Sequence, residues 1–209
     1  MLTECEIKAI YDYPLFSDSE RQHYFYLSQR ELAFVNILKK PENKIYFILM
    51  LGYFKAKTIF YRICFKKSHL DLIYITKTIF AISTNKLTYQ LPSKNTIIKI
   101  KQLVYELLNI SSETKLNQLI YEKINNLAKY NVAPINIFKD LLSYLKDHNI
   151  PIPAYTSLQT LIGNSILEEE KRLTKIIDEH FPQYAVKIID NLLIAKDGLY
   201  PITALKTDP

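Results

Sequence analysis

Lysine side chains cluster in one short stretch of this chain, where their charge could bind phosphate. Residues 36–67 contain eight basic residues and one acidic residue, a local net charge of +7, whereas all 209 residues together carry +6. A dense basic stretch of this kind is typical of a surface that binds nucleic acid. An AT-rich genome would explain the lysine total but not the clustering. The candidate phosphate-binding residues are Lys39, Lys40, Asn43, Lys44, Lys55 and Lys57.

A helix, a tight turn and a second helix are predicted to position these residues. Ser28 and Glu31 have the spacing of a capping box, in which the hydroxyl accepts from the N3 amide and the carboxylate reaches back. Pro41 ends the first helix, because the residue before a proline avoids the α region, and it suits the first position of the next helix. That second helix is apolar on nearly every face, which predicts burial. The outline fits a DNA-binding helix-turn-helix, and also any helix hairpin.

A second group of candidates lies at the start of a long helix expected from Tyr155. The helix before it is predicted to open at Pro134 and to end before Pro151. Short polar side chains near a helix N-terminus can approach a base edge or a phosphate, and glutamine can pair with adenine. The alternative is that Thr156 and Ser157 act only as N-caps. The candidate base-contacting residues are Thr156, Ser157, Gln159 and Thr160.

No pattern in the sequence predicts catalysis, a cofactor or a metal site. The acidic run at 168–170 falls on an amphipathic helix, where carboxylates usually face solvent. Cys5 and Cys64 have neither metal-ligand spacing nor a disulfide framework. The histidines have no paired spacing and no nucleophile beside them; they are His23, His69, His148 and His180. We therefore expect a protein that is not an enzyme and binds no cofactor.

The same composition predicts a location. The N-terminus lacks the basic and then apolar layout of a signal peptide, and no apolar run reaches the ~20 residues that span a bilayer. Free cysteines suit a reducing compartment. We expect a cytoplasmic, nucleoid-associated protein without a membrane partner.

The whole chain is predicted to be all-α, as tandem small helical bundles that contain helix-turn-helix-like units. With only three glycines, it has little hairpin chemistry and no glycine-rich phosphate loop. A polar, proline-ended stretch at 84–92 predicts a linker between a first submodule, 1–83, and a second, 93–181. Residues 182–209 are expected to form a C-terminal helix and tail.

Hydroxyl residues mark further helix starts. Thr3 with Glu6, and Ser68 with Asp71, have capping-box spacing, with aspartate the weaker partner. Ser17 or Asp18, and later Ser93, are expected to cap one helix each.

An ordered set of residues between positions 16 and 60 carries a resemblance to a known family. Its members are Phe16, Ser17, Glu20, Arg21, Tyr24, Phe25, Leu27, Glu31, Leu32, Pro41, Asn43, Phe47, Leu49, Leu51, Tyr53 and Phe60. The set resembles the N-terminal region of the large replicative transposases of the Tn-three family. That region has the pattern F-S-x-x-E-R-x-x-Y-F-x-L-x-x-x-E-L, then R-x-P-x-N-R-L-G-F-A-L-Q-L-x-Y-L-R-x-x-G-R-F.

A second segment resembles the family's L-x-x-L-x-x-x-x-I-x-x-P-x-x-x-T-L pattern, through Leu142, Leu145, Ile150, Pro153, Ser157 and Leu158. Lys94 falls where the family has an R-x-x-x-R-x-H-x-x-x-I motif, so the resemblance adds it to the candidate DNA contacts. This chain lacks the arginines and the histidine of that motif. Lys44 and Lys55 also replace family arginines, which keeps the charge but loses bidentate geometry.

The resemblance implies sequence-specific binding of double-stranded DNA at transposon terminal inverted repeats. The chain would be the N-terminal part of a transposase, partnered by the rest of that protein, while homodimerisation of the full-length protein stays open. The family's nuclease uses three acidic residues on an RNase H-like sheet, downstream of the region that aligns. Two alternatives remain: a helical protein-interaction or scaffold module, and a decayed transposase remnant.

Overall fold

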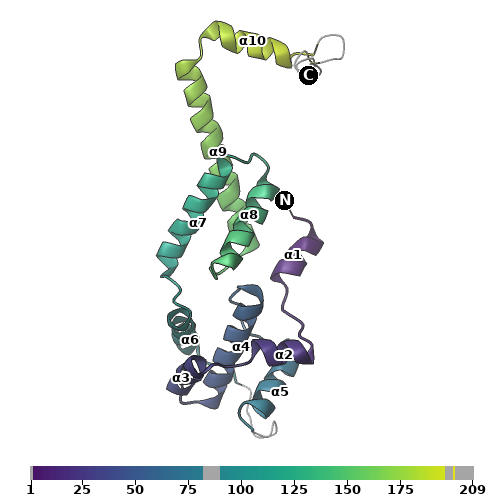
Figure 1. The fold of residues 1–209 in the computed structure, drawn as a ribbon, viewed down its shortest axis with the longest axis vertical. Coiled ribbons are helices and arrows are strands. Elements are labelled where there is room, and N and C mark those ends of the chain that lie inside the picture. The colour runs from purple at the N-terminus through teal and green to yellow at the C-terminus, as the bar shows by residue number, and fades with distance from the viewer. Residues whose placement is uncertain (1, 82–89, 196–199, 201–209) are drawn as a thin grey trace. The chain divides into compact units, whose positions relative to one another are not determined.

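The computed structural model describes residues 2–81, 90–195 and 200, and in these residues it contains ten helices and no strand (Figure 1). This confirms the all-α prediction. The helices are α1 (Glu4–Tyr11), α2 (Asp18–Tyr24), α3 (Gln29–Ile37), α4 (Pro41–Lys57), α5 (His69–Thr78), α6 (Lys94–Leu107), α7 (Glu113–Ala128), α8 (Pro134–Asp147), α9 (Tyr155–His180) and α10 (Gln183–Leu193). Contacts divide the chain into two units, Met1–Gly163 and Asn164–Pro209.

Helix α4 forms the centre of the first unit. Every residue from Ile45 to Phe54 is buried, as the apolar sequence on all faces predicted. Helices α2, α3, α5 and α6 all pack against it. The helix ends at Thr58, whose φ of 57° is left-handed.

The capping boxes predicted at Thr3 and Ser28 are present, and Ser17, predicted only as a possible cap, forms another. Thr3, Ser17 and Ser28 each accept from the backbone N–H three residues on, and the glutamates at those positions reach back to the cap. The box predicted at Ser68 and Asp71 is wrong. Ser68 is the N-cap of α5, but its backbone is not extended (φ −95°, ψ 15°) and its side chain makes no cap hydrogen bond. The Asp71 carboxylate binds Arg21 and Tyr53 instead of reaching back.

The later helices of the first unit bury apolar side chains as well. Helix α7 packs against α8, and Ile124, Ile137 and Leu158 are fully buried. The segment between α8 and α9 reaches the end of α4, where the Ile152 N–H donates to the Thr58 carbonyl at 2.9 Å.

The expected division at 84–92 stays a prediction, because residues 82–89 lie outside the described residues. Helices α3 and α4, from the first predicted submodule, pack against α6, from the second. The contacts therefore place helices from both predicted submodules in one unit.

The second unit holds the later part of α9 and the helix expected near the C-terminus, α10. Its apolar side chains are largely exposed: Leu173, Ile176 and Ile177 on α9, and Ile188, Ile189 and Leu193 on α10. Among the described residues, no helix is long and apolar enough to cross a membrane.

Candidate nucleic-acid interface

The turn between α3 and α4 exposes two lysines. Pro41 occupies the first position of α4, so Lys40 before it is extended, with φ −87° and ψ 134°. Lys40 is the N-cap but makes no side-chain cap hydrogen bond. Lys39 and Lys40 are therefore exposed, with both side chains available to a ligand.

The first turn of α4 opens onto a cleft that it shares with the first turn of α6. The cleft has a volume of about 570 Å³, and its lining includes Lys40, Glu42, Asn43, Leu91, Ser93 and Thr96. Ser93 caps α6 as predicted, because its hydroxyl accepts from the Thr96 N–H at 3.3 Å. Helix N-termini carry partial positive charge. We call this hollow the α4–α6 cleft.

Lys94 and Lys44 add charge beside this cleft. Lys94 is the first residue of α6, directly after Ser93, and is exposed. Lys44 lies in the second half of the first turn of α4, and its ammonium donates to the Asn36 side chain at 3.2 Å. The structure thus places Lys40 and Asn43 in the lining of the cleft, with Lys39 and Lys44 beside them in sequence. Lys94, from the second predicted submodule, directly follows the lining residue Ser93.

A second hollow adjoins the α4–α6 cleft and adds two basic residues that the sequence reasoning missed. It has a volume of about 530 Å³, and its lining includes Arg62, Phe65, Lys66 and Leu91. Leu91 lines both hollows, so Arg62 and Lys66 belong to the same basic surface. Both residues were part of the +7 charge of residues 36–67, which was the only signal that could have found them.

Two predicted contacts lie elsewhere and have structural partners. The Lys55 ammonium forms a 2.7 Å ion pair with Glu31 and donates to the Tyr26 carbonyl at 2.9 Å. The Lys57 ammonium donates to the Ala9 carbonyl at 2.7 Å. Lys55 is fifteen residues beyond Lys40, about 22 Å along a helix that rises ~1.5 Å per residue. These two lysines are not part of the basic surface at the start of α4.

The remaining candidates lie on the first two turns of α9. The Leu158 N–H bonds the Ala154 carbonyl at 3.1 Å, so the helix starts before Thr156 and Ser157, and neither is the N-cap. Both are exposed, Gln159 is half-buried, and Thr160 donates its hydroxyl to the Thr156 carbonyl at 3.0 Å. These side chains present short polar groups to solvent without any lysine among them.

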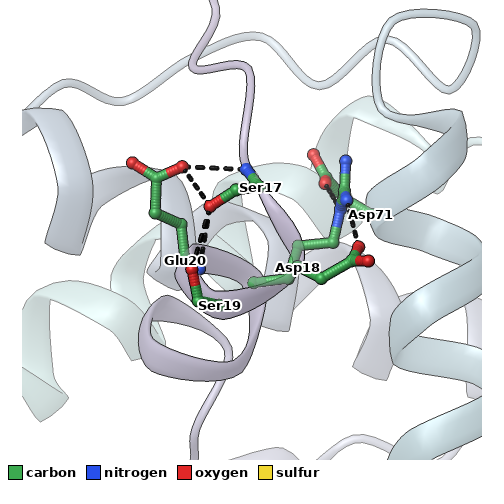
Figure 2. A network of polar contacts seen from close by, with 6 residues as sticks. Ser17, Asp18, Ser19, Glu20 and Asp71 are labelled. Atoms are coloured by element: carbon green, nitrogen blue, oxygen red, sulfur yellow. Dashed lines mark hydrogen bonds and ion pairs between the residues drawn. The ribbon is translucent and has the colours of Figure 1, made fainter.

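The residues of the family pattern have structural roles. Figure 2 shows the Ser17 and Glu20 capping box beside Asp18 and Asp71. The next residue, Arg21, bonds Asp71 through Nε at 2.7 Å and Asp18 through Nη1 at 2.9 Å. The F-S-x-x-E-R pattern therefore specifies how α2 starts and how it is fixed to α5.

No candidate site for catalysis emerges from the described part of the chain. None of its His, Cys, Asp and Glu side chains gather in groups of three or more that could hold a metal ion. In the described acidic run, Glu169 forms a 2.6 Å ion pair with Arg172.

Comparison with known proteins places the chain in a family. Residues 1–164 match a family described as "Domain of unknown function (DUF4158)". No curated protein matches. The matched segment covers the whole first unit, including the basic surface and the start of α9. The chain belongs to this DUF4158 family.

Proposed function

We propose that this chain binds double-stranded DNA, as the N-terminal part of a Tn-three family transposase that recognises terminal inverted repeats. The observation that carries the proposal is the basic surface around the α4–α6 cleft. The resemblance of residues 16–60 supplies the transposase context, and the surface supplies a place for the DNA backbone.

The charges of this surface suit a phosphate backbone. Its basic residues come from three separate segments. Lys40, Arg62 and Lys66 line the two hollows, and Lys39, Lys44 and Lys94 are each next in sequence to a lining residue. Each lysine or arginine that neutralises a phosphate releases condensed counterions, so binding should weaken steeply with salt. Glu42 is the one acidic side chain among the lining residues of the two hollows, and it opposes binding.

Base recognition would need a second contact, which the start of α9 can supply. Thr156 and Ser157 are exposed on a first helical turn, where short side chains let a groove approach the backbone. The Ile152–Thr58 bond fixes the segment before α9 to the far end of α4. The two contact regions are thus separated along α4 by about 25 Å, within one turn of duplex DNA.

The exposed apolar side chains of the second unit favour a different candidate function. Contiguous apolar faces on α9 and α10 are typical of surfaces that bind another protein. A helical interaction module would bind its partner through those faces, independently of DNA. A decayed remnant would bind neither.

The test is binding of this chain to duplexes that carry the terminal repeats flanking its gene, against scrambled duplexes, over a salt series. We expect repeat preference at moderate salt, and Lys40→Ala should weaken binding and reduce the salt slope by about one unit. Lys115→Ala is the matched control, because Lys115 is an exposed lysine on α7 outside both hollows.

Two outcomes would contradict the proposal. Equal and steeply salt-sensitive binding to both duplexes would show a basic surface without sequence recognition. Absence of binding by intact protein would favour the interaction module.

A further inference from the structure

Helix α1 lies against the start of α9. The Leu2 N–H donates to the Tyr155 hydroxyl at 3.2 Å, and the Tyr11 hydroxyl donates to the Pro153 carbonyl at 3.0 Å. The rings of Tyr11 and Tyr155 meet edge to face at 6.2 Å between centroids. Residues at both ends of α1 therefore contact the chain directly around the first turn of α9.

This helix is held by a few contacts. None of its residues is fully buried, and Ile7, Ile10 and Tyr11 are half-buried. A further hydrogen bond among the described residues joins the Lys57 ammonium to the Ala9 carbonyl. The chain is fixed firmly only beyond α1, where the Tyr61 hydroxyl donates to the Asp12 carbonyl at 3.0 Å and Pro14 is buried. A helix tied by a few hydrogen bonds can detach without unfolding the rest.

The charge of α1 opposes DNA. Glu4 and Glu6 are exposed in its first turn, while Lys8 is its single basic residue. A duplex that reached Thr156 and Ser157 would bring its phosphates close to these carboxylates. Like charges at short range disfavour that approach.

We propose that α1 is an autoinhibitory strap, which blocks duplex DNA from the first turn of α9 until it detaches. The proposal rests on the DNA-binding function proposed above and concerns the regulation of its base-contacting part. The apparent dissociation constant of the chain is then its intrinsic value divided by the fraction of molecules in which α1 is detached. Anything that loosens α1 should tighten DNA binding.

Tyr11→Phe tests this with little change in shape. The substitution removes the hydroxyl that bonds Pro153 and keeps the ring against Tyr155. One such hydrogen bond corresponds to about a five-fold change in the detached fraction. We expect Tyr11→Phe to bind the repeat duplex about five-fold more tightly. Tyr130→Phe is the matched control, because Tyr130 is 86% exposed, and it should bind as the wild type does.

A second variant tests the charge of α1 without removing the hydrogen bonds that hold the helix in place. Glu4→Gln combined with Glu6→Gln removes both carboxylates, and glutamine at position 6 can preserve the capping box. It should also bind more tightly, with the gain largest at low salt. Hydrogen exchange of residues 4–11 should become faster when DNA is added to the wild-type chain.

The outcomes distinguish the two proposals. If Tyr11→Phe binds equally or more weakly, or if DNA slows exchange in α1, the strap is wrong, and loss of binding in Lys40→Ala would still support the DNA-binding function. If neither the wild type nor the strap variants bind any duplex, the DNA-binding function is wrong, and the strap with it.

Discussion

The Arg21 guanidinium and the Asp71 carboxylate meet at 2.7 Å between α2 and α5, and the second Asp71 oxygen accepts a 2.7 Å hydrogen bond from the Tyr53 hydroxyl. The side chains of Arg21 and Asp71 are only 11% and 6% exposed. Burial, followed by the hydrogen bond and charge of Asp71, raises the pKa of Tyr53. Three elements thus depend on one carboxylate.

Asp71→Asn should therefore be strongly destabilising. It leaves the Arg21 charge nearly buried, with only the exposed Asp18 as its partner, and should lower the free energy of unfolding by about 2–4 kcal/mol. Urea unfolding followed by circular dichroism measures this loss. Asp18→Asn is the control, because that side chain is 99% exposed, and it should unfold at the wild-type midpoint. Equal effects of the two variants would contradict the structural role of Asp71.

Gly52 permits a close approach between α4 and Phe25. A Cβ added at Gly52 would lie 2.3 Å from Cε1 of that ring, which is itself buried. Gly52→Ala should force the ring to move and lower the free energy of unfolding by about 1–3 kcal/mol. Gly163→Ala meets nothing within 4 Å and should be neutral or stabilising, because alanine favours a helix. Thermal unfolding should show a lower melting temperature for Gly52→Ala and an unchanged or higher one for Gly163→Ala.

Removing the charge of Glu42 tests the basic surface, because this change should increase the affinity for DNA. Its carboxylate lines the α4–α6 cleft next to Lys40 and Asn43. Glu42→Gln removes a repulsive charge and should tighten DNA binding about two- to five-fold at low salt, less at high salt. Glu106→Gln, an exposed change near the other end of α6, should leave affinity unaltered. Fluorescence anisotropy with a labelled duplex would measure both, and unchanged affinity in Glu42→Gln would argue that DNA does not use this cleft.

Stability should fall at alkaline pH because several tyrosines are buried, Tyr11, Tyr46 and Tyr53 as well as Tyr13 and Tyr61. Burial raises the pKa of Tyr13 and of Tyr61 to about 12, above the value near 10 of an unfolded chain. The folded state therefore keeps these protons where the unfolded state has lost them, so the stabilisation is complete below pH ~10 and disappears as pH rises toward 12. Urea midpoints at successive pH values should fall over this range.

The matched variants identify the groups responsible. Tyr61→Phe should make the alkaline loss of stability shallower, because one proton fewer is released on unfolding. Tyr130→Phe, at an exposed position, should leave the pH profile unchanged. A wild-type midpoint that stays constant to pH 12 would show that none of the buried hydroxyls titrates with unfolding.

Local sequence predicted the helices well, and tertiary contacts account for the errors. Ser28 and Glu31 are three residues apart and form their capping box although the Glu31 carboxylate also pairs with the distant Lys55. Ser68 and Asp71 have the same spacing, but the Ser68 backbone is not extended and Arg21, fifty residues away, binds the Asp71 carboxylate. No local pattern could show this competition.

In the candidate site, too, local patterns predicted some residues, and tertiary packing determines the others. Lys39 and Lys40 could be placed on a turn because Pro41 dictates it. That Lys94 and Arg62 join them depends on how α6 and the segment after α4 pack, which no periodicity reports. The +7 charge of residues 36–67 indicated a basic surface without giving its shape.

The bond between Ile152 and Thr58 has a consequence for biosynthesis. It joins residues ninety-four positions apart, so the carbonyl just after the buried helix α4 gains its partner only when a segment that the ribosome makes much later has emerged. Contacts of such long sequence separation form late and slow folding. While it is being made, the nascent chain therefore exposes part of α4 to chaperones and proteases, and completes its first unit only once the loop before α9 has emerged.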